Sequence, residues 1–173
     1  MNFEFVILDF LYSFHNPILD DIMVFITHLG DKGFLWIAVC LAMSFSKKYK
    51  KAGYAGLLSL LLMLIIGNIT LKPLIARIRP YEFTHGINLL IPKPNDFSFP
   101  SGHSFASFSA ATSIFCFHKK EGIASYVLAF LIAFSRLYLY VHFPSDVIAG
   151  IVLGAVIGIF SAKIVSKVKF FNF

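Results

Sequence analysis

Charged residues are scarce in this sequence. Only 14% of its 173 residues are Asp, Glu, Lys or Arg, whereas soluble globular domains carry about 25%. Apolar residues make up 58% of the chain, 21 residues are Phe, and the mean hydropathy is +0.79. A chain of this length could not hide so much apolar surface from water, which excludes a soluble globular fold and intrinsic disorder. We therefore expect one membrane-embedded domain over residues 1–173.

Cysteines and metal-ligand patterns are also few. Cys40 and Cys116 lie inside apolar runs and form no CxxC pair, so a disulfide framework or a zinc site is not expected. The sequence has no HExxH and no acidic cluster of the kind that holds magnesium, so we expect neither a metal nor a cofactor. The first nine residues carry acids instead of a basic segment, which is atypical of a cleaved signal peptide.

The apolar runs predict an all-α, polytopic membrane helix bundle with about five transmembrane helices. Charged residues separate the runs Phe34–Phe45, Tyr54–Leu71, Ser104–Phe117, Ile123–Tyr140 and Val147–Val165. A crossing needs about 20 residues. We therefore expect the first run to recruit residues before Gly33, and the third to begin below the membrane surface.

Two further patterns concern the ends of the chain. Residues Asn2–His28 alternate apolar and acidic positions, which predicts one or two N-terminal amphipathic helices at the membrane interface, with a sixth crossing as the alternative. In the last run, Gly150, Gly154 and Gly158 form a ladder of small residues. We expect this ladder to pack against another helix of the same chain, with a dimer face as the alternative.

The positive charge is unevenly distributed. Nine of the 15 Lys and Arg residues lie at residues 47–51, 119–120 and 163–169. These segments share one side of the membrane if five spans alternate, and the positive-inside rule makes that side cytoplasmic. Eight of the nine acids, all except Glu121, then fall on the outer side. The net charge of +6 therefore indicates a membrane partner and not nucleic acid.

Four other cations lie near the outer ends of spans: Lys72, Arg77, Arg79 and Arg136. An ionised side chain at the bilayer centre costs about 2.5–3.5 kcal/mol, so these cations need compensation. One interpretation is that they extend to the interface or pair with Glu82 and Asp96. The other is that they converge on an anion.

Two short motifs on the same side favour an anion site. Pro100-Ser101-Gly102-His103 precedes the third run, where a Ser-Gly pair would offer backbone N–H groups to an anion or simply cap the helix. Farther on, His142 precedes Asp146 by four residues, and a carboxylate can fix the tautomer of an imidazole used in nucleophilic catalysis. Basic, Ser-Gly-His and His-Asp elements at one membrane face predict a phosphate-handling site.

These motifs together resemble the complete three-part signature of the type 2 phosphatidic acid phosphatase family. The matching pattern is Lys72-x6-Arg79-Pro80, then Pro100-Ser101-Gly102-His103, then Ser135-Arg136-x5-His142-x3-Asp146. The resemblance covers residues 72–146 and includes both internal spacings. Family members with six spans have an additional N-terminal helix that this sequence does not show.

The resemblance implies a metal-independent phosphatase that works through a phosphohistidine. It assigns His142 as the nucleophile, Asp146 as the residue that orients its ring, and His103 as the proton donor and later acceptor. The phosphate-binding residues that it implies are Lys72, Arg79, Ser101, Gly102 and Arg136. His15, His28, His85 and His118 match no motif position, and for them we expect interfacial or loop positions.

The implied substrate is a membrane lipid phosphate, hydrolysed at the outer (periplasmic) face of the cell inner membrane. Small bacterial members of the family act on undecaprenyl diphosphate, phosphatidylglycerol phosphate or the 1-phosphate of lipid A, and the sequence does not choose among them. Two alternatives remain open. One is a phosphotransferase that passes the phosphoryl group from lipid to lipid, and the other is a phosphate-binding transporter that would not need His142 or Asp146.

Overall fold

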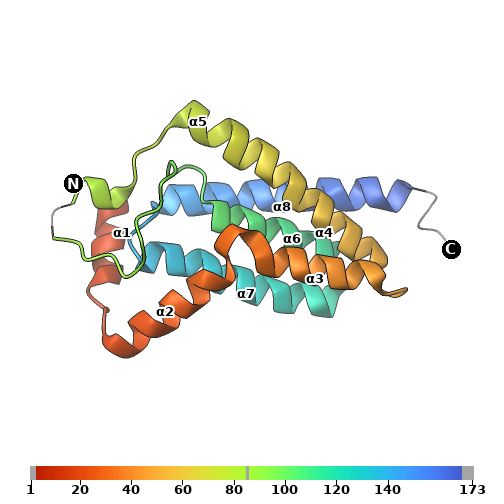
Figure 1. Ribbon diagram of the computed structural model, residues 1–173, viewed down its shortest axis with the longest axis horizontal. Helices are drawn as coiled ribbons and strands as arrows, with labels where there is room; N and C mark the ends of the chain where they lie inside the picture. The colour runs from red at the N-terminus through yellow and green to blue at the C-terminus, as the bar shows by residue number, and fades with distance from the viewer. Residues whose placement is uncertain (1–2, 85, 169–173) are drawn as a thin grey trace.

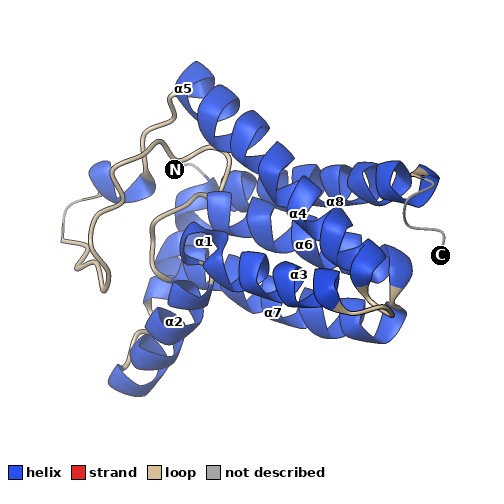
Figure 2. Cartoon of the chain, turned by 45° about the vertical axis from the view of Figure 1, so that its right-hand side comes forward, coloured by secondary structure: helices blue, strands red, loops and turns tan. Residues whose placement is uncertain are grey.

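The computed structural model describes residues 3–84 and 86–168, and the regular elements in these residues are all helices (Figures 1 and 2). In chain order they are α1 (Phe3–Tyr12), α2 (Pro17–Leu29), the 3-10 turn η1 (Asp31–Gly33), α3 (Phe34–Phe45), α4 (Lys50–Met63), the π-helix η2 (Leu64–Leu71), α5 (Lys72–Ile75), the 3-10 turn η3 (Pro80–Glu82), α6 (Gly102–Phe117), α7 (Lys119–Tyr138) and α8 (Pro144–Lys167). The predicted all-α class is confirmed.

Among the described residues, four helical segments are long and apolar enough to cross a membrane: Pro17–Phe45, Lys50–Glu82, Lys119–Tyr138 and Pro144–Lys167. They correspond to the first, second, fourth and fifth predicted runs, and the first recruits residues before Gly33 as expected. The third run corresponds to α6, which has 16 residues and is shorter than a full crossing. The count of five crossings therefore stays a prediction.

Helix α6 lies at the centre of the bundle, packed against α4, α7 and α8 (Figure 1). Its packing face is rich in Ser and Ala, which allows neighbouring helices to approach closely. The glycine ladder of α8 faces this helix. A Cβ atom added at Gly154 would lie 2.8 Å from the carbonyl oxygen of Phe105, so only glycine fits there. The ladder therefore packs within the chain, as the sequence predicted.

The three basic segments meet at one end of the bundle, on the right in Figure 1. The Tyr49 hydroxyl, between α3 and α4, donates to Glu121 of α7 at 2.7 Å, and its ring lies 4.6 Å from that of His118. The C-terminal end of α8 lies at the same end; Lys169, counted in the third basic segment, falls outside the described residues. One end of the molecule is thus strongly basic.

The N-terminal helices cover the opposite end of the bundle (Figures 1 and 2). Two buried tyrosines at the end of α7 attach them: Tyr138 donates to Asp20 of α2 at 2.6 Å, and Tyr140 donates to Asp9 of α1 at 2.7 Å. Tyr140 has a left-handed backbone (φ 59°), which is unusual for a residue with a side chain. This conformation reverses the chain between α7 and α8, where the histidine of the third motif lies.

Candidate active site

The first motif places two cations beside each other at this end. Lys72 begins α5 directly after the π-helix, and π-helical turns are frequent at functional sites. Arg79 lies in the extended segment that leads into η3. Their side chains are only 7% and 4% exposed, respectively, so both positive charges are withdrawn from solvent and need partners.

The partner that both cations share is Asp96. One carboxylate oxygen of Asp96 contacts the Lys72 ammonium, and the other accepts from a guanidinium nitrogen of Arg79 at 2.6 Å. Arg79 also donates to the Asp96 backbone carbonyl at 2.9 Å. Burial by itself would raise the pKa of the Asp96 carboxyl, but the two cations outweigh burial and lower this pKa from 3.8 to about 2. The two cations thus hold an anion between them.

His142 lies beside this group, in the turn between α7 and α8. A guanidinium nitrogen of Arg79 is 3.2 Å from His142 Nε2 and also donates to the Val141 carbonyl at 2.6 Å. Burial lowers the pKa of His142 well below its ordinary value of 6.5, and the nearby cations, Arg79 first, act in the same direction. The imidazole is therefore neutral at physiological pH, and Nε2 is its unprotonated nitrogen when Nδ1 carries the proton.

Asp146, in the first turn of α8, lies on the other side of the His142 ring. Its Oδ2 atom is 3.5 Å from His142 Nδ1, and it accepts hydrogen bonds from the Ser98 hydroxyl at 2.5 Å and the Phe143 N–H at 2.9 Å. Its Oδ1 atom accepts from Arg77 at 2.6 Å. Arg77 in turn pairs with Glu4 of α1 at 2.7 Å. Asp146 is therefore held rigidly, and Arg77 and Ser98 are partners that the motif did not indicate.

The second motif forms the first turn of α6. The Ser101 hydroxyl is fully buried and caps the helix, accepting from the Ser104 N–H at 3.4 Å and the Ser104 hydroxyl at 2.9 Å. The Ser101 N–H donates to the backbone carbonyl of Asp146 at 3.1 Å, which ties the second motif to the third. Gly102 and His103 line the adjacent cavity, whereas Ser101 does not.

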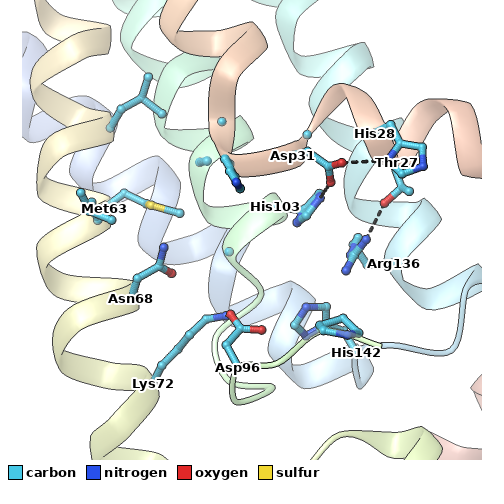
Figure 3. A pocket seen from close by; sticks show the side chains of 18 of the residues that line it. Thr27, His28, Asp31, Met63, Asn68, Lys72, Asp96, His103, Arg136 and His142 are labelled. Carbon is cyan, nitrogen blue, oxygen red and sulfur yellow. Dashed lines mark hydrogen bonds and ion pairs between the residues drawn. The ribbon is translucent and has the colours of Figure 1, made fainter. Parts of the chain in front are cut away.

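Two contacts join this site to the last turn of α2 and to the turn that follows it. Arg136 of α7 donates to the Thr27 hydroxyl at 2.6 Å, and His103 Nε2 lies 3.1 Å from Asp31 Oδ1 (Figure 3). The buried Nε atom of Arg136 has no hydrogen-bond partner in the part of the chain that the structure describes. Arg136 therefore keeps a donor that an anion could occupy.

One cavity of about 880 Å³ connects these groups (Figure 3). Its polar end is lined by Lys72, Arg79, His103, Arg136 and His142, and its walls toward α3 and α4 are apolar, with Ile37, Leu57, Leu60, Leu61, Met63 and Leu64. A cationic end joined to an apolar groove is suited to an amphiphile with an anionic head.

The structure brings together all eight residues expected at the site, and six of them line the cavity. Lys72, Arg79, Gly102, His103, Arg136 and His142 line the cavity, and Asp146 supports His142 from behind. Ser101 lies within the group but uses its hydroxyl as a helix cap. Asp31, Thr27 and Ser98 were missed because they stand outside the motifs and nothing in their local sequence marks them.

Comparison with known proteins decides the family. Residues 56–170 match the model of the PAP2 superfamily. The chain belongs to the PAP2 superfamily. The undecaprenyl-diphosphatase of Sulfolobus acidocaldarius is 36% identical over 149 residues, which are 86% of this chain and 71% of that protein. The undecaprenyl-diphosphatase BcrC of Bacillus subtilis is 29% identical, over 91% of this chain and 81% of that protein.

A solved structure agrees with this PAP2 assignment. The crystal structure of a transmembrane PAP2 type phosphatidylglycerolphosphate phosphatase from Bacillus subtilis superposes with a TM-score of 0.80 at 29% identity, covering 96% of this chain and 86% of that one. The PAP2 protein is thus a multi-pass membrane phosphatase, in agreement with the resemblance found in its sequence.

Proposed function

We propose that this PAP2 phosphatase hydrolyses the head-group phosphate of a polyprenyl diphosphate of the undecaprenyl type. The observation that carries the proposal is the single cavity that joins a cationic end to an apolar groove along α4. Two relatives named undecaprenyl-diphosphatase support this substrate class. Phosphatidylglycerol phosphate and the 1-phosphate of lipid A present the same chemistry, and we treat them as competing substrates.

The phosphoryl group binds where the Asp96 carboxylate now joins Lys72 and Arg79. Arg79 can grip two phosphoryl oxygens with its planar guanidinium, and Lys72 acts as a point charge. Arg136 adds the donor on its unpartnered Nε atom. These three cations, with the N–H groups at the start of α6 near Gly102, stabilise the charge of a five-coordinate transition state without a metal ion.

His142 attacks phosphorus through Nε2. Its Nδ1 atom faces Asp146 and Ser98, so Nε2 is the nitrogen on the side of Arg79. A P–N bond forms while the bond to the leaving oxygen breaks. Asp146, 3.5 Å from Nδ1, stabilises the positive charge that the ring acquires.

His103 moves the protons. In the first step it gives a proton to the leaving oxygen of the lipid, which departs as the product. In the second step it accepts a proton from the water that attacks the phosphohistidine; the P–N bond then breaks and inorganic phosphate is released. A histidine suits both steps because its charged form can donate a proton and its neutral form can accept one.

The site faces the outer (periplasmic) side of the membrane in this proposal. The basic segments lie at the opposite end of the bundle, and positively charged segments remain in the cytoplasm. The orientation can be checked in a variant whose Cys40 and Cys116 are replaced by alanine, by placing a single cysteine at Glu82, near the site, or at Lys48, at the basic end, and labelling intact cells with a membrane-impermeant thiol reagent. Labelling at position 82 alone supports the proposal, and labelling at position 48 alone contradicts it.

The function is tested with purified protein in detergent. Undecaprenyl diphosphate, phosphatidylglycerol phosphate and lipid A 1-phosphate are compared by phosphate release, with and without EDTA. We expect the polyprenyl diphosphate to give the highest kcat/KM and EDTA to have no effect. His142→Ala should lower turnover by about 10³-fold or more, whereas His118→Ala, at the basic end, should not.

Three outcomes would contradict parts of this proposal. Near-normal hydrolysis by His142→Ala would remove the nucleophile. Transfer of the phosphoryl group to an added lipid alcohol in preference to water would indicate a phosphotransferase. Activity lost in EDTA and restored by a divalent cation would overturn the metal-independent scheme.

A further inference from the structure

The last turn of α2 and the turn that joins it to α3 contribute three contacts to the catalytic end of the cavity. Thr27 holds the Arg136 guanidinium at 2.6 Å, Asp31 holds His103 at 3.1 Å, and the backbone of Gly30 lies against the His103 ring. The turn precedes residue 56, where the superfamily match begins, and it also precedes the first motif at Lys72. These contacts are therefore supplied by a segment outside the recognised signature.

Asp31 is fixed on both sides. Its Oδ1 atom is 3.1 Å from His103 Nε2, and its Oδ2 atom is 2.7 Å from His28 Nδ1 (Figure 3). Within the described residues, Nε2 is the one ring nitrogen of His103 with a hydrogen-bond partner, and the ring itself lines the cavity. A ring whose Nε2–H donates to Asp31 leaves Nδ1 for the substrate.

Gly30 clamps the same ring. A Cβ atom added at Gly30 would lie 2.5 Å from His103 Cδ2 and 2.7 Å from Ile132 Cγ2. These distances are too short for any side chain, so the main chain itself forms one wall against the imidazole. The ring is thus held in its plane by the backbone and in its tautomer by Asp31.

The charges around His103 give the Asp31 carboxylate a second role, which is to stabilise the protonated ring. Lys72 and Arg136 line the same cavity, and both oppose a positive charge on His103. His103 must nevertheless carry a proton when the leaving oxygen departs. Asp31 is the acid in contact with the ring that can stabilise this protonated form.

We infer that Asp31 is a positioning residue for proton transfer, which binds Nε2–H of His103 so that Nδ1 faces the leaving oxygen of the substrate. The inference rests on the proposed function of His103 as the general acid. In the first step the proton on Nδ1 passes to the leaving oxygen as the P–O bond breaks, and the neutral ring keeps its Nε2–H on Asp31. In the second step Nδ1 accepts the proton of the attacking water, and the starting state is restored.

This arrangement predicts that the effect of replacing Asp31 on the reaction rate depends on the leaving group of the substrate. An alkoxide leaving group needs a proton, whereas 4-nitrophenolate departs without one. The experiment compares kcat/KM for a short-chain dialkylglycerol phosphate with kcat/KM for 4-nitrophenyl phosphate. The ratio kcat/KM reports steps up to phosphoryl transfer and excludes the later hydrolysis of the phosphohistidine.

We expect Asp31→Asn to lower kcat/KM for the alkyl phosphate by about 10²-fold, and for 4-nitrophenyl phosphate by less than about threefold. Asp31→Ser should behave in the same way, which guards against a misfolding effect of a single substitution. Asp21→Asn is the matched control, because Asp21 lies on exposed helix surface in α2 and its loss should leave both substrates unaffected. Asp31→Asn should add little to the defect of His103→Ala, since the two residues act as one unit.

The outcomes separate the inference from the function on which it rests. An equal loss on both substrates in both Asp31 variants would show a purely structural contact and overturn the inference, with the proposed phosphatase mechanism intact. A selective loss in Asp31→Asn but not in His103→Ala would overturn the assignment of His103 as the acid. Activity on either substrate that is unaffected by His142→Ala would overturn the phosphohistidine mechanism itself.

Discussion

Asp96 should compete with the substrate for its phosphate site. The carboxylate joins Lys72 and Arg79, the two cations proposed to bind the phosphoryl group, so a phosphate must displace it. Asp96→Asn keeps the size of the side chain and removes its charge. We therefore expect this variant to bind inorganic phosphate and orthovanadate more tightly than the wild type does.

The size of the effect follows from the charge interaction. The pKa of Asp96 falls from 3.8 to about 2, which corresponds to about 2.4 kcal/mol at 1.36 kcal/mol per pKa unit. The Asp96 side chain is 54% exposed, so solvent screening reduces the interaction energy between its charge and the two cations to about 1 kcal/mol. That energy corresponds to about a fivefold change in a dissociation constant.

The assay is inhibition of lipid phosphate hydrolysis. The inhibition constants of phosphate and vanadate should fall about fivefold in Asp96→Asn, and KM for the lipid should fall in the same direction. Glu82→Gln is the matched control, because Glu82 pairs with Lys93 at 3.7 Å and its loss changes the net charge equally. Unchanged or higher inhibition constants in Asp96→Asn would show that the carboxylate orients the cations and does not compete.

Two further predictions concern stability, measured as the thermal unfolding midpoint in detergent. Folding lowers the pKa of His142 below 6.5, so the folded protein favours the neutral imidazole. The resulting stabilisation is complete above pH 6.5 and is lost as the pH falls below that value, so His142→Asn should lose less stability than the wild type between pH 7 and 5. An equal loss of stability with pH in the two proteins would contradict a neutral, buried imidazole. Gly154→Ala should lower stability by about 1–3 kcal/mol through overpacking against the α6 backbone, although Gly→Ala inside a helix is normally stabilising. Val152→Ala, on the exposed side of α8, is the control. A rise in the unfolding midpoint of Gly154→Ala would refute the close contact.

The sequence predicted the helical class, the apolar runs and the glycine ladder correctly. These properties depend on local composition and periodicity, which can be read within a window of about 20 residues. It also predicted that the first run recruits residues before Gly33 and that the third run is shorter than a full crossing, but it did not show how these segments pack. The kink at Asp31–Gly33 and the central place of α6, whose Ser and Ala side chains are buried against three neighbouring helices, depend on tertiary packing.

The motif residues show the same division. Fixed spacing identified Lys72, Arg79, His103, Arg136 and His142, and the structure places them around one cavity. Motif spacing could not identify the partner of each residue. The sequence did suggest Asp96 as a counter-ion, but as an alternative to an anion site, whereas in the structure its carboxylate pairs with Lys72 and Arg79, where we propose that the phosphoryl group binds.

Composition and motif spacing by themselves determined that this chain is a membrane helix bundle with a phosphate-handling signature, because hydropathy and short-range spacing are properties of neighbouring residues. Only the tertiary structure decided that Ser98 and Arg77 hold Asp146, and that Asp31 holds His103 across 72 positions of sequence. Pairing between distant side chains depends on how the helices pack, and that packing is set by contacts along the whole bundle. Local sequence does not encode it.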